Sequence, residues 1–303
     1  MSFIGLCKFA LLAAHVVTSI ATPLENRASE ELVQTPAGFF PKSNVHAVPD
    51  GATVHQSPTE SAGVLQRPNS TTTSRRALQS GYVAFTNWRN AGPSPISFFG
   101  TNWHVPPIPS TWNGQLLYWF NGLVPDDFNG ILQPVLQYGV SPAGGGQFYS
   151  IASWWLIDNN VYHTGITPVS PGTFLQGQMT LTGTSTSGGV TTYSYSCTFV
   201  GYPGTTISAS STRVLNRAYE ALEIYTTQVK SDLPSGNTVF STINITFQNG
   251  QHPSSIPWEA ISDPTDGITI TVLSDSGPLV PFSLYIRVMG ILELVDKGTS
   301  SKS

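Results

Sequence analysis

The chain has 303 residues, enough for one large β domain or two small ones. Charged residues make up only 10% of it and the formal net charge is −4. This composition gives no basis for binding nucleic acid or an anionic membrane surface, so we expect neither as a partner. The 28 glycines and 23 prolines indicate many short strands joined by turns.

Residues 1–21 have the pattern of a secretory signal peptide. Lys8 precedes an apolar run, and Ser19-Ile20-Ala21 supplies a cleavage site of small residues. The apolar run is too short to span a membrane. We therefore expect a secreted, extracellular protein. Removal of the signal also removes Cys7, which leaves Cys197 unpaired, and we expect its thiol to be buried and unreactive.

Residues 22–76 show no sustained period of 2 or 3.6 and are rich in Pro, Ser, Thr, Gln and Glu. We expect them to be a largely disordered propeptide. The dibasic pair Arg75-Arg76 stands directly before the first strand-like run, which predicts cleavage there on secretion. Glycosylation sequons begin at Asn69 and at Asn244.

Turn residues recur at strand intervals from residue 77 onward, with no helical units between them. The strand-like runs are 82–88, 96–103, 115–121, 131–138, 148–157, 174–181, 191–200, 238–247, 267–273 and 282–288. This pattern predicts an all-β domain from residue 77 to 303, an antiparallel β-sandwich or jelly roll. The last residues form a polar tail that we expect to be disordered.

Two glutamines stand out in the apolar strand predicted for residues 131–138. Gln133 and Gln137 share one face of an extended strand, because successive side chains alternate between faces. A buried amide without partners costs roughly 1–3 kcal/mol, so each needs a hydrogen-bonding role. That role is either a contact with neighbouring backbone or a contact with a ligand or reacting carbonyl.

Residues 218–225 carry two glutamates and fit either a short helix or a strand. In a strand, Glu220 shares a face with Leu222 and Ile224. Glu223 shares the opposite face with two tyrosines, including Tyr225, as expected for a site lined by aromatic side chains.

Several chemistries lack the residues that they need. His104, His163 and His252 are scattered along the sequence, so we expect no metal site and no cofactor. Glu220 and Glu223 would lie on opposite strand faces and cannot form the carboxylate pair of a glycosidase. A non-catalytic, lectin-like binder of polysaccharide or another surface remains an alternative, because tryptophans such as Trp119 on a sandwich can hold sugars.

Trp119-Phe120-Asn121-Gly122 and Val135-Leu136-Gln137-Tyr138-Gly139-Val140 lie on two neighbouring strands of the predicted sandwich. They resemble the pattern W-x-G followed by I-L-Q-x-G-V of the fungal glutamic peptidases, the eqolisins. Residues 151–156 are similar to the family's aromatic strand, although Ser153 stands where the family has a glutamate. Residues 170–181 and 219–225 resemble later strands, the second of which carries the family's catalytic glutamate.

The resemblance covers roughly residues 115–247 and implies a concanavalin A-like β-sandwich. It also implies a secreted hydrolase that uses a glutamate and a glutamine to activate water against a peptide carbonyl at acidic pH. The family cysteines are missing here, which leaves an inactive relative as an alternative.

We take Gln137 with Glu223 as the predicted catalytic pair, because Gln137 keeps the family register and Glu223 has the tyrosine-lined face. Gln133 and Glu220 are the alternatives. The residues predicted to bind substrate are Trp119, Trp154 and Tyr225, and we expect a monomer that takes protein or peptide substrates.

Overall fold

The computed structural model describes residues 30–56, 78, 80–274 and 282–288. The described chain from Glu31 onward is one compact unit built almost entirely of strands. The two short helical turns in this part are the 3-10 segments η1 (Lys42–Asn44) and η2 (Lys230–Asp232). No helix within the described ranges is long and apolar enough to cross a membrane.

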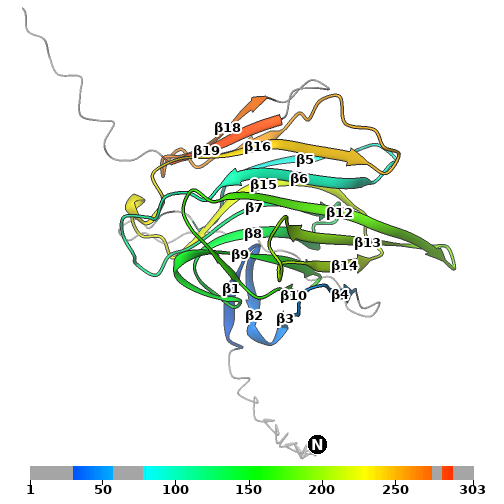
Figure 1. Cartoon of the computed structure of the whole chain (residues 1–303), viewed down its shortest axis with the longest axis horizontal. Coiled ribbons are helices and arrows are strands. Elements are labelled where there is room, and N and C mark those ends of the chain that lie inside the picture. The colour runs from blue at the N-terminus through cyan, green and yellow to red at the C-terminus, as the bar shows by residue number, and fades with distance from the viewer. Residues whose placement is uncertain (1–29, 57–77, 79, 275–281, 289–303) are drawn as a thin grey trace, which may run out of the picture. The chain divides into compact units, whose positions relative to one another are not determined.

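Two large sheets form the two layers seen in Figure 1. The nine-stranded sheet has the order β17 (Glu259–Ile261), β5 (Gly81–Arg89), β15 (Leu215–Tyr225), β7 (Leu116–Pro125), β8 (Gly130–Ser141), β9 (Gly144–Ile157), β10 (Asn160–His163), β3 (Val45–Ala47), with β11 (Thr167–Val169) also pairing with β9. The eight-stranded sheet has the order β18 (Ile268–Ser274), β19 (Phe282–Val288), β16 (Gly236–Phe247), β6 (Ile96–His104), β12 (Phe174–Ser187), β13 (Val190–Phe199), β14 (Ile207–Ser211), β4 (Ala52–His55).

The predicted β-sandwich is confirmed, and each of the ten strand-like runs lies on a strand. Residues 218–225, which fit either a helix or a strand, are part of β15. The pairings are antiparallel except where β3 joins β10 and β4 joins β14, both in parallel.

Two hydrophobic clusters lie on the two faces of the nine-stranded sheet. The inner cluster is shared with the eight-stranded sheet and includes Trp119 from β7 and Trp103 from β6. The outer cluster includes Tyr118 and Phe120 from β7, and Phe40 from the N-terminal segment. Because the sheet is buried on both faces, its central strands read as continuous apolar runs rather than as alternating ones.

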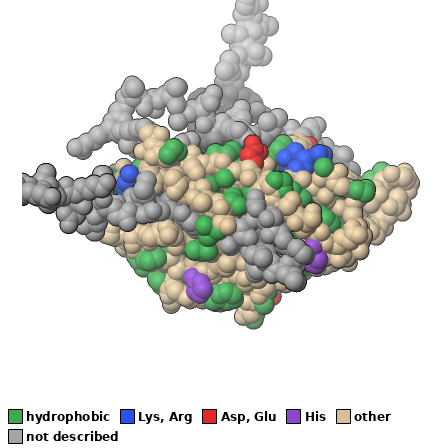
Figure 2. All heavy atoms as spheres, turned by 90° about the horizontal axis from the view of Figure 1, so that it is seen from above, with side chains coloured by type: hydrophobic (Ala, Val, Ile, Leu, Met, Phe, Trp, Pro, Cys, Tyr) green, Lys and Arg blue, Asp and Glu red, His purple; other side chains and the backbone are tan. Residues whose placement is uncertain are grey.

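Residues 30–56 contain four strands, although the sequence predicted little order for residues 22–76. β1 (Leu32–Thr35) and β2 (Gly38–Pro41) form a separate hairpin, whereas β3 and β4 extend the two large sheets. The physical reason is that these short segments pair with the edges of a sandwich formed by distant residues, which no local periodicity reveals. Figure 2 shows one face of the molecule, where uncharged side chains and backbone predominate.

Cys197 lies in the inner cluster, free and fully buried. Burial raises the pKa of its thiol to about 12. The predicted burial is therefore confirmed, and its low reactivity stays a prediction. The signal peptide, Arg75-Arg76, Asn69 and the C-terminal tail lie outside the described residues, whereas Asn244 is exposed on β16.

Candidate active site

The two glutamates of β15 lie on opposite faces of the nine-stranded sheet. Leu222 and Ile224 belong to the inner cluster, and Ala221 and Tyr225 to the outer one. Glu220 is correspondingly on the inner side, where its Oε1 accepts a hydrogen bond of 2.5 Å from Thr101 Oγ1 of the eight-stranded sheet. Glu223 is on the outer side, where Tyr225 donates its hydroxyl hydrogen to the carboxyl group.

Gln137 lies on the same outer face, but its side chain makes its hydrogen bonds within the β8–β9 hairpin. In the strand register Tyr118 stands opposite both Glu223 and Gln137. The Gln137 amide donates to the Gly144 carbonyl at 3.0 Å, and its oxygen accepts from Ser141 Oγ at 2.9 Å. These contacts make Gln137 a brace for the β8–β9 hairpin.

Gln133 makes a different contact, which joins it to the N-terminal segment. Its Nε2 donates to the carbonyl oxygen of Pro36 at 2.6 Å. The next backbone N–H, that of Ala37, donates to Glu223 Oε1 at 3.2 Å. One peptide bond of the chain is thus held at its carbonyl by Gln133 and at its N–H by Glu223.

That peptide bond is at the tip of the β1–β2 hairpin. Thr35 pairs with Gly38, so Pro36 and Ala37 form a two-residue turn. The central amide of such a turn takes no part in the strand pairing, which leaves both of its polar groups for other partners. Ala37 has a φ of 124°, a backbone conformation that residues with a Cβ rarely adopt.

Aromatic contacts fix the hairpin over the outer face. Tyr118 donates its hydroxyl hydrogen to the Gln34 carbonyl at 3.3 Å. Phe39 packs edge-on against Tyr225, with ring centroids 5.4 Å apart. Phe40 is only 5% exposed and belongs to the outer cluster. The hairpin therefore covers the site. Two surface hollows of the described chain lie elsewhere, one beside Pro95 and one beside Tyr202.

Burial dominates the electrostatics of Glu223. Removal from water raises the pKa of its carboxyl from 4.5 to about 8, although the hydrogen bonds from Tyr225 and Ala37 act in the opposite direction. Burial also raises the pKa values of Tyr82, Tyr118 and Tyr225. With the hairpin in place, the Glu223 carboxyl is therefore neutral at acidic pH.

Gln133 and Glu223 each have one buried side-chain oxygen without a hydrogen-bonding partner among the described residues. These atoms are Gln133 Oε1 and Glu223 Oε2. Other buried polar atoms of the described chain, Glu220 Oε2 among them, also have no such partner, so this property alone does not mark a site.

The aromatic residues predicted to bind substrate divide between the two faces. Trp119 is in the inner cluster against Tyr149, away from Glu223. Trp154 is on the outer face, opposite Gln133 in the strand register, and it packs against His163 at 4.8 Å. Tyr225 contacts Glu223 directly. Two of the three thus share the face of the candidate pair.

Pro36, Ala37 and Tyr118 contribute to the site but were not among its predicted residues. A local signal for the hairpin does exist, because Pro36-Ala37-Gly38 is a turn sequence between Leu32–Thr35 and Phe39-Phe40. The described residues contain no group of His, Cys, Asp and Glu side chains able to hold a metal ion.

No family model matches this chain, and no curated protein matches it. Among solved structures, it is similar to Scytalido-glutamic peptidase with a peptide-based transition-state analogue. The TM-score is 0.47 at 14% identity, over 70% of this chain and 99% of that one. It is also similar to SCP-B, a member of the eqolisin family of peptidases, in a complex with the tripeptide Ala-Ile-His. There the TM-score is 0.45 at 14% identity, over 71% of this chain and all of that one. Both are peptidases of the family that the sequence motifs resemble.

Proposed function

We propose that the protein is an acid-acting peptidase in which Gln133 and Glu223 form the catalytic pair. The observation that carries this proposal is the Pro36–Ala37 peptide bond, whose carbonyl oxygen is bound by Gln133 and whose N–H is bound by Glu223. The two side chains contact the carbonyl oxygen, which gains negative charge during peptide hydrolysis, and the amide nitrogen, which gains a proton.

The chemistry follows from the positions of these atoms. In an open site Glu223 takes a proton from a water molecule that attacks the carbonyl carbon. Negative charge then develops on the carbonyl oxygen, and the Gln133 Nε2–H donor already points at that atom. A preorganised donor of this kind lowers the barrier by about 2.7–4 kcal/mol. Glu223 next returns the proton to the amide nitrogen, the atom whose N–H it contacts here, and the C–N bond breaks.

The pKa of Glu223 supports an acidic working range once the hairpin has left. Burial is the main cause of its raised pKa, and part of that burial comes from the hairpin. Admission of water moves the pKa back toward 4.5, so that the carboxyl can act as base and then as acid near pH 4.

The alternative of a polysaccharide binder receives less support from the structure. A sugar platform needs exposed aromatic faces, and Trp119 and Trp154 are 1% and 0% exposed. The binding partner that we propose is therefore an unfolded protein or a peptide.

The test compares the two glutamines of β8 in secreted protein held at pH 4, with an unfolded protein as substrate. We expect Gln133→Ala to reduce turnover by about 10²-fold or more. The matched variant Gln137→Ala should digest within a few-fold of the parent, because that amide contacts only its own hairpin. Loss of turnover in Gln137→Ala with full turnover in Gln133→Ala would move the site to Gln137. Absence of turnover in the parent after residues 30–56 have been removed from it, with the sandwich still folded, would reject the function.

A further inference from the structure

We propose that Asn244 carries an N-linked glycan whose first sugar packs against the ring of Phe98, on the outer face of the eight-stranded sheet. This modification is independent of the proposed peptidase function, because Glu223 lies on the other layer of the sandwich. Four features of the described chain point to it: the sequon, the exposure of Asn244, the aromatic ring beside it and the neutral strands around it.

The sequon Asn244-Ile245-Thr246 lies within β16, where its two functional residues face outward. Ile245 is 1% exposed and belongs to the inner cluster, so Asn244 and Thr246 on either side of it point to the outer face. Asn244 is exposed there. An N-linked glycan is bulky and soluble, and it is found on surface asparagines followed by this spacing of Ser or Thr. The folded chain can therefore carry a sugar at Asn244 without opening the sandwich.

A break in the strand register precedes Asn244. The pairing of β16 with β6 shifts between Ser241 and Asn244, and Thr242 within this break has a φ of 51°. A bulge of this kind bends its strand and re-aims the side chains beside it. The regular pairing resumes with Asn244 opposite Gly100 of β6. The asparagine thus stands next to a position that has no side chain of its own.

The ring of Phe98 occupies the space above Gly100. A Cβ atom at Gly100 would lie 2.7 Å from Phe98 Cζ and 2.9 Å from Phe98 Cε1. Phe98 is half-buried and stands opposite Thr246, diagonally across from Asn244. Diagonal neighbours on one face of a sheet are within reach of an aromatic side chain. The first sugar on Asn244 would therefore meet an aromatic ring.

The chemistry of that sugar matches the ring. An N-linked glycan begins with N-acetylglucosamine, which presents C–H groups on the faces of its ring and a methyl group on its acetyl arm. The face of an aromatic ring carries partial negative charge, which attracts C–H groups. The contact also removes apolar area of Phe98 from water. Phe98 would thus hold the glycan against the sheet.

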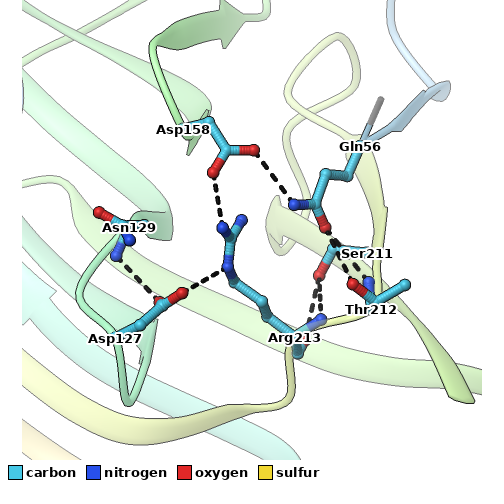
Figure 3. A network of polar contacts seen from close by, with 7 residues as sticks. All are labelled: Gln56, Asp127, Asn129, Asp158, Ser211, Thr212 and Arg213. Carbon is cyan, nitrogen blue, oxygen red and sulfur yellow. Dashed lines mark hydrogen bonds and ion pairs between the residues drawn. The ribbon is translucent and has the colours of Figure 1, made fainter. Parts of the chain in front are cut away.

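The strands around Asn244 are neutral. The five adjacent strands β16, β6, β12, β13 and β14 contain no Asp, Glu, Lys or Arg. Charged side chains pair in loops instead, as in Figure 3, where Arg213 binds Asp127 at 2.6 Å and Asp158 at 2.7 Å. A face without charge has little electrostatic protection against association. A glycan at Asn244 would give this face a hydrated cover.

The first experiment measures occupancy of the sequon. The full chain is expressed with its own leader in a yeast that N-glycosylates secreted proteins, and Asn69→Gln is present in every variant so that one sequon remains. We expect glycopeptide mass spectrometry to find most secreted molecules modified at Asn244. Thr246→Val removes the hydroxyl that the sequon requires and should leave Asn244 bare. Retention of the chain in the cell, or its secretion with Asn244 bare, overturns the modification.

The second experiment tests the contact with Phe98. An endoglycosidase trims the glycan to its first sugar, and thermal unfolding of each trimmed protein is compared with that of the same protein carrying Thr246→Val. We expect the sugar to raise the midpoint by about 2–4 °C. Phe98→Leu keeps an apolar side chain but removes the ring, and the difference should disappear. The matched control is Phe174→Leu, whose ring is 53% exposed on β12 opposite His104 and which should keep the full difference.

Nuclear magnetic resonance of the trimmed proteins gives a readout that a general loss of stability would not move. A sugar lying on an aromatic face has its proton signals shifted upfield by the ring. This shift should vanish in Phe98→Leu and remain in Phe174→Leu. A modified Asn244 whose sugar gives the same signals in both variants overturns the contact.

Discussion

Glu220 and Glu223 stand three residues apart on one strand, and both are fully buried with raised pKa values. The two carboxyls differ in the part of the structure that covers them. Glu220 lies between two sheets, bound to Thr101 of the opposite layer. Glu223 lies under the β1–β2 hairpin, which is a separate sheet and not part of either layer of the sandwich. Burial and a perturbed pKa are thus common to both carboxyls, and access is what distinguishes a candidate catalytic group from an internal polar group.

The largest effect that tests this comparison is on turnover. We expect Glu223→Gln to lower digestion at pH 4 by about 10²–10⁴-fold, because it removes the group that takes and returns the proton. Glu220→Gln, an isosteric change at a site with no access to substrate, should digest within a few-fold of the parent. If both variants were folded and lost the same share of turnover, access would not distinguish the two carboxyls.

The second test uses the pH dependence of stability. The raised pKa of Glu223 means that the folded protein binds more protons than the unfolded chain between pH 4.5 and about 8, so stability falls as pH rises through that window. Glu223→Gln removes this loss. Its free energy of unfolding, relative to the parent, should therefore increase by a few kcal/mol from pH 4 to pH 8. Denaturant titrations at both pH values measure this, and an unchanged difference would contradict the buried setting.

The third test concerns the internal carboxyl. Thr101→Val removes the hydroxyl that binds Glu220 and should destabilise the fold by about 1–3 kcal/mol in denaturant titration. Thr86→Val is the matched control on β5, where Thr86 stands opposite Glu220 in the strand register. The Thr86 hydroxyl is buried and has no partner among the described residues, so its loss should be neutral or slightly stabilising.

The smallest effect is at the hairpin tip. Ala37 has a φ of 124°, and glycine adopts this conformation without strain. Ala37→Gly should therefore tighten the hairpin by about 0.5–1 kcal/mol, after allowance for the greater freedom of glycine in the open chain. The measured result would be a slower onset of digestion after acidification, whereas a faster onset would show that the strain at Ala37 is unimportant for closure.

The features that the sequence predicted correctly are those that leave a pattern over a few neighbouring residues. Turn residues bound each predicted strand, and alternation correctly separated Glu220 from Glu223 on β15. The choice between Gln133 and Gln137 had no such basis, since both lie on one face of β8. Only the docking of Pro36, 97 residues away in sequence from Gln133, distinguishes them. Contacts of that length leave no mark on local periodicity.

The pairing of β3 and β4 with the sandwich also protects the edges of both sheets. Each of these strands covers the outermost strand of a sheet, β10 in one layer and β14 in the other. Were residues 30–56 removed, the backbone amides and carbonyls of β10 and β14 would become open templates for strands of other molecules. With so few charged side chains to keep molecules apart, a form without this segment would tend to aggregate as its concentration rises.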